Sequence, residues 1–154
     1  MCGILGIVSN NQNKDKNLFI LNKLIHRGPD DFGFWESSKV FLGQRRLSII
    51  DLSPAGKQPM FLKCKKTNKN LSLVFNGEIY NYKELKLELE KLGHSFFSNS
   101  DTEIILHSYE EWGIDSFLKF RGMFACVLYD LENEEIIIFR DRFGIKPIYY
   151  YLDD

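Results

Sequence analysis

The chain has 154 residues, which is the size of one domain and long enough to bury roughly two-thirds of the surface that its unfolded form exposes. Hydrophobic residues make up 44% of the chain and aromatic residues 14%, which predicts a packed core and excludes a disordered tail. Twenty Lys and Arg residues against 21 Asp and Glu residues leave a net charge of −1, so no nucleic acid or membrane partner is expected.

The cysteines and the N-terminus exclude further classes of protein. Three cysteines without close spacing form neither a disulfide framework nor a zinc site. The chain lacks the charged start and long apolar core of a secretion signal, and no run approaches the ~18 apolar residues of a membrane span. We therefore expect a reducing, cytoplasmic environment, with Cys126 buried inside the apolar run 123–128.

The N-terminus places Cys2 directly after Met1 and before a short apolar strand at 3–8. Removal of Met1 would give Cys2 a free α-amine next to its own thiol. Such amines titrate near ~7.7–8.0 and such thiols near ~8.5, so one residue would supply both a nucleophile and a base. By position alone, however, a second-residue cysteine is more often an incidental feature of a disordered end.

Hydrophobic periodicity predicts a chain in which two central helices separate groups of strands. The first half is predicted to contain a strand at 3–8, a helix through Leu18, Leu21 and Ile25 ending near 27–30, a hairpin of 32–35 with 40–43, a loop at 51–59, and a strand at 71–75. The second half is predicted to contain a helix at 81–92 ended by Gly93, a helix from Ser100, and strands at 123–130, 135–140 and 147–152.

Ser100 followed three residues later by Glu103 is the signature of a capping box, which predicts the start of the second central helix. One face of that helix carries Ile105, Tyr109 and Trp112. Apolar runs before and after the two helices favour stacked sheets covered by helices, so the predicted fold class is α+β and layered.

The sharpest internal motif is Asn76-Gly77, at the end of the strand 71–75. Asn-Gly after a strand most often forms a tight hairpin turn, because both residues tolerate positive φ. Here a helix rather than a strand follows, which weakens that interpretation. The alternative is an oxyanion hole made by the Asn76 side-chain amide and the backbone N–H of Gly77.

Two further positions carry charge that could bind a substrate. Arg45 and Arg46 precede a β-branched stretch and are either a solvated pair or a strand pair, of which one side chain faces inward and binds a carboxylate through two hydrogen bonds. Asp101 lies in the first turn of the capped helix. It either complements the helix dipole, worth ~0.3–1 kcal/mol, or pairs with a substrate ammonium group.

The three histidines, His26, His94 and His107, stand apart in the sequence without the spacing of metal ligands, and we expect ordinary surface or packing roles for them. Motifs of nucleotide-binding, zinc-protease and serine-hydrolase type are absent from the sequence. The candidate nucleophile therefore has no evident histidine base, and its own amine is the economical substitute.

Several segments in order resemble one family over nearly the whole chain. They are MCGI at 1–4, HRGPD at 26–30, RLSIIDL at 46–52, FNGEIYNY at 75–82, SDTE at 100–103, FRGMFACVLYD at 120–130 and RDRFGIKPIYY at 140–150. Together they resemble the glutamine amidotransferase domain of the class II, N-terminal nucleophile type. The segments RLSIIDL and FNGEIYN are most similar to those of asparagine synthetase. They are less similar to those of glutamine phosphoribosylpyrophosphate amidotransferase, glucosamine-6-phosphate synthase or glutamate synthase.

The resemblance implies a four-layer αββα sandwich of the N-terminal nucleophile hydrolase type, with residues 1–154 forming the glutaminase domain. It implies these roles: Cys2 as nucleophile, Asn76 and Gly77 as oxyanion hole, Arg46 on the glutamine α-carboxylate, Glu78 and Asp101 on the α-amino group, backbone near Leu47 and Ile49 lining the pocket, and Arg27 supporting the site. The implied reaction is hydrolysis of L-glutamine to glutamate and ammonia through a thioester on Cys2. It requires no metal or organic cofactor.

In this family the ammonia passes to a synthetase domain that uses ATP and Mg²⁺ to activate a carboxylate, and the sequence contains no such domain. We expect the chain to be a C-terminally truncated fragment of a longer synthetase, since it stops just after a tyrosine run at 149–151. The alternative is an autonomous domain that acts with a separate subunit. A face left open by the missing stretch would favour homodimers.

Two other functions compete with asparagine synthesis. The same domain could feed another acceptor, such as a sugar or a different carboxylate, and this half of the sequence does not decide between acceptors. A non-catalytic relative that binds glutamine for regulation is the other alternative. The presence of Cys2, Arg46, Asn76, Gly77 and Asp101 argues against it, because a binding module has no need of a terminal thiol.

Overall fold

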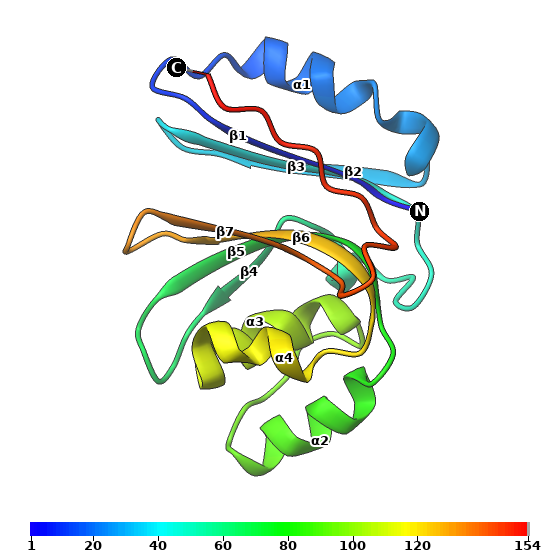
Figure 1. The fold of residues 1–154 in the computed structure, drawn as a ribbon, viewed down its shortest axis with the longest axis vertical. Helices are drawn as coiled ribbons and strands as arrows, with labels where there is room; N and C mark the ends of the chain where they lie inside the picture. Colours follow the sequence, from blue (N-terminus) through cyan, green and yellow to red (C-terminus); the bar gives the residue numbers. More distant parts are fainter. Residues whose placement is uncertain (154) are drawn as a thin grey trace.

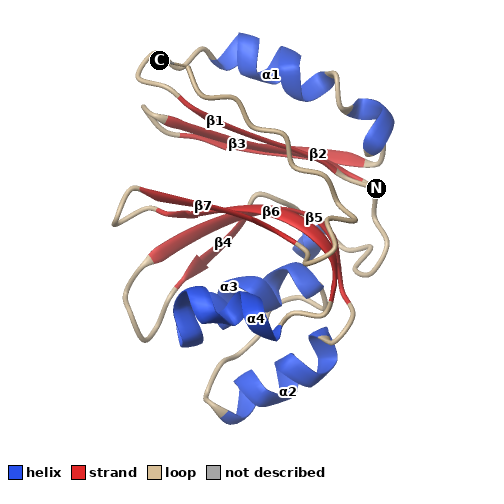
Figure 2. Cartoon of the chain, viewed as in Figure 1, coloured by secondary structure: helices blue, strands red, loops and turns tan. Residues whose placement is uncertain are grey.

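The computed structural model describes residues 1–153 and has four layers. Helix α1 (Lys14–Asn22) covers an antiparallel sheet of order β1-β3-β2, and this sheet faces a second antiparallel sheet of order β4-β5-β6-β7 (Figure 1). Helices α3 and α4 cover the far face of the second sheet, and α2 packs against α3 (Figure 2). The α+β class and the αββα sandwich expected from the sequence are therefore confirmed.

The strands and helices have these bounds. The first sheet contains β1 (Gly3–Val8), β2 (Asp31–Glu36) and β3 (Val40–Arg46), and the second contains β4 (Met60–Lys63), β5 (Asn70–Ile79), β6 (Gly122–Asp130) and β7 (Glu135–Arg140). The remaining helices are α2 (Tyr82–Lys91), α3 (Asp101–Trp112) and α4 (Ser116–Lys119), and single 3-10 turns lie at Ile25–Arg27, Pro54–Gly56 and Gly113–Asp115.

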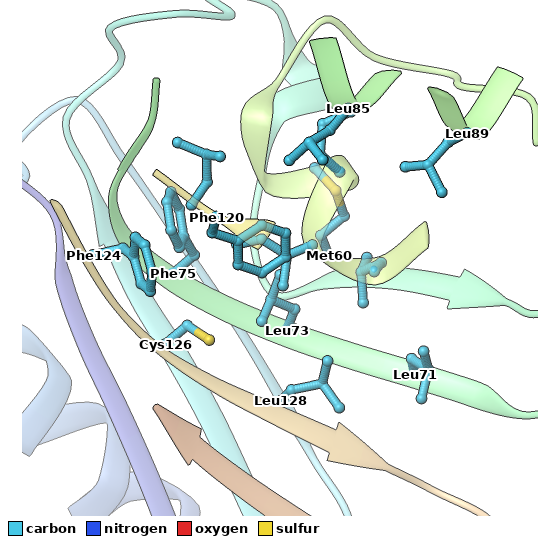
Figure 3. Packing of buried hydrophobic residues seen from close by; sticks show 14 of the residues in the cluster. Met60, Leu71, Leu73, Phe75, Leu85, Leu89, Phe120, Phe124, Cys126 and Leu128 are labelled. Carbon is cyan, nitrogen blue, oxygen red and sulfur yellow. The ribbon is translucent and has the colours of Figure 1, made fainter. Parts of the chain in front are cut away.

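The core has two parts because the central strand β5 is buried on both faces. Leu73 and Phe75 point toward the helices and pack with Leu85 and Phe120 (Figure 3). Val74, between them, points the other way and packs between the two sheets. Alternating side chains of a strand face opposite sides, so a strand covered on both faces is apolar at successive positions. This explains the apolar run at 71–75.

Most predicted elements are confirmed, with shifted ends. The hairpin forms as β2 and β3, and the helix before it is completed by a 3-10 turn at Ile25–Arg27. Cys126 is fully buried in the larger core cluster. The prediction of a hairpin turn at Asn76-Gly77 is wrong, because β5 continues through both residues to Ile79 while paired with β6.

The predicted strand at 147–152 is wrong. This segment follows β7 without ladder pairing, and its side chains from Tyr149 to Leu152 are 77–91% exposed. Aromatic residues favour strands mainly by packing against cross-strand neighbours. No neighbouring strand within residues 1–153 pairs with this segment. The strand propensity of its aromatic residues is therefore not enough to form a strand.

The predicted capping box is confirmed for Ser100 but not for Glu103. Ser100 is the N-cap of α3, and its hydroxyl accepts a hydrogen bond from the Thr102 N–H at 3.2 Å. Glu103 does not bond back to the Ser100 N–H. Its carboxylate instead accepts from the backbone N–H groups of Phe97 and Ser98 at 2.9 and 2.8 Å. The Ser98 hydroxyl donates to the same carboxylate at 2.6 Å, so the segment before α3 offers Glu103 three donors in place of one.

The expectation that the histidines stand apart is wrong for two of them. The Nδ1 atoms of His94 and His107 lie 3.1 Å from one another, and both side chains are buried. Thirteen residues separate them in the chain, and the turn between α2 and α3 brings them together. His26 remains exposed, as expected.

None of the helices within residues 1–153 combines the length and the apolar character needed to cross a membrane.

Candidate active site

One cavity of about 80 Å³ gathers the predicted site residues at the end of the sandwich where β1 begins and β3 ends. Its lining includes Cys2, Arg46, Leu47, Ile49, Asn76, Gly77, Glu78 and Asp101. Of the nine residues predicted from the sequence, only Arg27 lies outside this lining. These residues come from β3, β5, α3, the loop after β3 and the position just before β1, so only the tertiary fold brings them together.

Cys2 is held at the edge of the first sheet by contacts on both its side chain and its backbone. Its Sγ accepts a hydrogen bond from the Leu47 N–H at 3.4 Å and lies 3.6 Å from the Leu47 carbonyl oxygen. Arg27 Nε donates to the Cys2 carbonyl oxygen at 3.1 Å. The antiparallel register that sets Gly3 opposite Arg45 puts Cys2 beside Arg46. Arg27 therefore contacts the backbone of the thiol-bearing residue, and its guanidinium does not line the cavity.

The two neighbouring arginines are both buried but point in opposite directions. Arg46 lines the cavity and donates to the carbonyl oxygens of Asp51 and Ser53. Arg45 lies on the other face of β3, where its guanidinium stacks 4.7 Å from the ring centre of Phe32. This alternation is the ordinary consequence of strand geometry. The interpretation of a solvated basic pair is therefore wrong.

Strand β5 presents a row of backbone N–H groups to the cavity beyond the point where β4 stops pairing with it. Register with β4 ends at Leu73, so no strand of residues 1–153 pairs with residues 75, 77 and 79 on that side. The N–H of Phe75 donates to Gln58 Oε1 at 2.6 Å, and the N–H of Ile79 donates to Asp101 Oδ2 at 2.9 Å. The N–H of Gly77 lies between these two on the same edge.

The opposite edge of Gly77 confirms this orientation. Phe124, its partner on β6, exchanges both backbone hydrogen bonds with Asp141 instead of with β5. The Gly77 N–H is therefore directed toward the cavity. Glycine is required here, because φ is +155° and a Cβ would lie 2.1 Å from the Met123 carbonyl oxygen. The neighbouring Asn76 also lines the cavity, and within residues 1–153 its side-chain amide donates no hydrogen bond.

Asp101 is a buried carboxylate at the start of α3, with only 4% of its surface exposed. Its pKa is raised to about 6, mainly by burial and also by the nearby Glu78 carboxylate, against the lowering effect of the Ile79 hydrogen bond. A cationic ligand at this point would compensate the charge that burial leaves unpaired.

Among the cavity residues that the sequence analysis missed are Gln44, Gln58 and Lys146. Gln44, from β3, donates to the Phe75 carbonyl oxygen at 2.9 Å, and Gln58 connects Phe75 to the hydroxyl of Thr102 on α3. Both glutamines are buried and brace the cavity edge of β5. Lys146 is also buried in the cavity wall, where its ammonium contacts the Met1 sulfur. Lys146 lies inside the quoted segment RDRFGIKPIYY, which was the available signal.

Comparison with known proteins decides the family. The family model for a glutamine amidotransferase domain matches residues 1–154. The chain belongs to this family. The amidotransferase domain is 38% identical over 157 residues to asparagine synthetase [glutamine-hydrolyzing] 3 of Bacillus subtilis (strain 168), with 97% of the chain and 25% of that relative covered. It is 40% identical over 153 residues to asparagine synthetase [glutamine-hydrolyzing] 3 of Arabidopsis thaliana, with the same two coverages.

A solved structure supports the fold of the amidotransferase domain. The glutamine phosphoribosylpyrophosphate amidotransferase of B. subtilis superposes with a TM-score of 0.73 at 19% identity, over 90% of this chain and 37% of that one. At such low identity the likeness concerns the fold alone, which is the N-terminal nucleophile sandwich expected from the resemblance. The domain spans about a quarter of the length of the two asparagine synthetases that it matches.

Proposed function

We propose that this domain hydrolyses L-glutamine to glutamate and ammonia, with Cys2 as the nucleophile. The observation that carries the proposal is the meeting of the Cys2 thiol with the Asn76–Gly77 corner in one cavity. An acyl-transfer site needs a nucleophile and two hydrogen-bond donors that converge on one carbonyl group. The names of the relatives, which are glutamine-hydrolysing enzymes, support glutamine as the amide.

The charges around the cavity suit the two ends of an amino acid. Arg46 would bind the α-carboxylate through two parallel hydrogen bonds, and its present acceptors are neutral backbone carbonyl groups that an anion would outcompete. Asp101 and Glu78 would bind the α-ammonium group, which stabilises the ionised carboxylates. Backbone at Leu47 and Ile49 would line the pocket between these ends.

The reaction follows from these positions once Met1 has been removed. The free amine of Cys2 takes the thiol proton, and the thiolate attacks the side-chain carboxamide carbon of glutamine. The Asn76 amide and the Gly77 N–H donate to the oxyanion. The ammonium group of Cys2 then protonates the departing nitrogen, which leaves as ammonia, and water hydrolyses the remaining γ-glutamyl thioester and regenerates the thiol. No metal is required for any of these steps.

We further infer that the ammonia passes to an ATP- and Mg²⁺-dependent synthetase domain that makes asparagine, either in the same polypeptide or in a separate subunit. The names of the relatives and their roughly fourfold greater length support this inference. A sugar or another carboxylate as the acceptor is the alternative within the same chemistry.

Replacing the nucleophile tests the proposal. In protein whose Met1 has been removed, Cys2→Ala should abolish ammonia release from glutamine and leave glutamine binding within about threefold, because the groups that would hold the amino acid remain. Cys64→Ala is the matched control, since Cys64 is buried in the helix-side core and lies outside the cavity. Ammonia release and calorimetric binding give the two readouts. Equal turnover in wild type and Cys2→Ala would refute Cys2 as the nucleophile.

A further inference from the structure

A second cluster of titratable side chains lies on the helix side of the second sheet, away from the cavity of Cys2. His94 follows α2, and His107 and Glu110 lie one turn apart on α3. The exposed fractions of their side chains are 4%, 6% and 2%. Three potential ligand atoms converge: the Nδ1 atoms of the two histidines are 3.1 Å apart, and Glu110 Oε2 is 3.5 Å from the first and 3.7 Å from the second.

The other ring nitrogen of each histidine faces its own carboxylate. His94 Nε2 lies 2.7 Å from Glu111 Oε2, and His107 Nε2 lies 3.4 Å from Glu103 Oε1. When the ring protons lie on Nε2, each faces a carboxylate oxygen and Nδ1 is the ligand atom.

In this tautomer, electron pairs face one another at the centre of the cluster. With both protons on Nε2, the two Nδ1 atoms are bare acceptors, and Glu110 adds a third acceptor between them. Glu110 is fixed in this pose because its other oxygen accepts from the Lys66 N–H at 2.8 Å. Such buried acceptors repel each other unless a cation lies among them.

The separations of these atoms suit a tetrahedral metal ion. A zinc ion about 2.0–2.1 Å from each ligand places neighbouring ligand atoms roughly 3.3–3.4 Å apart, and the three observed distances are 3.1, 3.5 and 3.7 Å. Carboxylates lie beside the outer nitrogen of each histidine, the position from which they usually support metal-bound imidazoles. We propose that His94 Nδ1, His107 Nδ1 and Glu110 Oε2 form a binding site for a divalent transition-metal ion of the zinc type.

A small cavity beside the cluster supplies access and the fourth position. It has a volume of about 80 Å³ and is lined by His94, His107 and Glu110 together with lysines of the β4–β5 connection. Water from this cavity completes the coordination.

The ion would have a structural role. It would tie the connection after α2 to α3 through the two histidines, and through Glu110 to the connection between β4 and β5. Imidazole and carboxylate ligands favour zinc, cobalt or nickel over magnesium or calcium. The site is independent of glutamine hydrolysis, because its ligands do not line the cavity of Cys2.

Metal binding to the purified, chelator-stripped protein tests the proposal. We expect one Zn²⁺ per chain in competition with a chromogenic chelator, and a rise in Tm on adding Zn²⁺. Co²⁺ should give the intense visible bands of tetrahedral coordination without a thiolate charge-transfer band, which excludes Cys2 and Cys64 as ligands.

Two conservative variants and one control locate the ion. Glu110→Gln keeps an oxygen for the Lys66 N–H, and His94→Gln keeps an amide donor toward Glu111, but each removes one ligand. Each should weaken Zn²⁺ binding by at least about 100-fold. His26→Gln, at the exposed histidine, should leave binding unchanged. If a variant does not fold, the Co²⁺ spectrum of the wild type decides. Absence of stoichiometric binding, a thiolate band, or full binding by folded Glu110→Gln would overturn the proposal.

Discussion

Arg45 and Arg46 show how much one position along a strand changes the environment of a side chain. The two residues are chemically identical and adjacent, and both are more than 90% buried. Arg46 reaches neutral carbonyl groups in the cavity, whereas Arg45 stacks on Phe32 and donates to Asn22 on the far face of β3. The strand pleat alone produces this difference. Arg45 is therefore a matched control for substitutions of Arg46.

We predict that Arg46→Lys raises the glutamine concentration needed for half-maximal ammonia release by about tenfold or more. Lysine keeps the charge but loses the planar fork, and one charge-assisted hydrogen bond is worth about 1.5–3 kcal/mol. Arg45→Lys should leave that concentration nearly unchanged and instead lower Tm, since it loses the Phe32 stacking. Steady-state kinetics and thermal melting of both variants provide the measurement. The opposite ranking would mean that the other arginine binds glutamine.

At the scale of elements, the edge of β5 and the start of α3 depend on one another. The N–H groups of Phe75 and Ile79 are both satisfied by side chains, those of Gln58 and Asp101, where a neighbouring strand would otherwise pair. This replacement leaves the Gly77 N–H at the open edge without a strand covering it. The arrangement also destabilises the folded protein, because it buries the Asp101 carboxylate and burial disfavours its ionised form.

The pH dependence of stability should reveal that destabilisation. The pKa of Asp101 rises from 3.8 in the unfolded chain to about 6 in the folded one, so the folded state binds more protons between these values. The Asp101 carboxyl therefore lowers the free energy of unfolding as pH rises from about 4 through 6, and the loss is nearly complete by about pH 7. Asp101→Asn should melt at a higher temperature than wild type at pH 8, since the amide still accepts from Ile79.

At pH 4.5 the difference between wild type and Asp101→Asn should shrink, because the wild-type carboxyl is then largely protonated. Thermal melting of both proteins at the two pH values measures this. The same variant should bind glutamine more weakly at pH 8, since it lacks the charge proposed for the α-ammonium group. A stabilisation equal at both pH values would show that Asp101 is not ionised when buried.

At the scale of the whole molecule, the proposed reaction depends on the removal of Met1 from the chain terminus. Met1 lines the cavity and contacts the buried Lys146, a residue 145 positions away. With Met1 attached, the nitrogen of Cys2 is an amide without a basic lone pair. The thiol then remains in place but lacks the proton carrier that the proposed reaction uses.

We predict that protein retaining Met1 releases no ammonia from glutamine, and that removing Met1 with a methionine aminopeptidase restores release. The mass of the N-terminal peptide, measured beside the rate, gives the processed fraction, and the rate should rise in proportion to it. The same treatment of Cys2→Ala is the control and should restore nothing. Full activity in unprocessed protein would exclude the α-amine as the base.

The pattern of apolar residues was sufficient to predict β1, the β2–β3 hairpin, β5 to β7 and the two central helices, because burial on one or both faces leaves a period that local sequence shows. The false strand at 147–152 has the same local signal. It differs only in having no neighbouring strand to pair with, and that depends on the rest of the chain. Glu103 likewise has the right spacing for a capping box, but a closer pair of donors at 97–98 takes its carboxylate.

Family membership, the identity of the candidate nucleophile and the Asn76–Gly77 motif could all be read from the order of residues, since each is a short run with specific chemistry. Only folding decided which arginine enters the cavity wall, that Gln58 and Asp101 free the Gly77 N–H, and that His94 meets His107. Each of these is a contact between segments far apart in sequence, set by strand register and helix packing. Such contacts minimise the free energy of the whole core, and no local pattern encodes them.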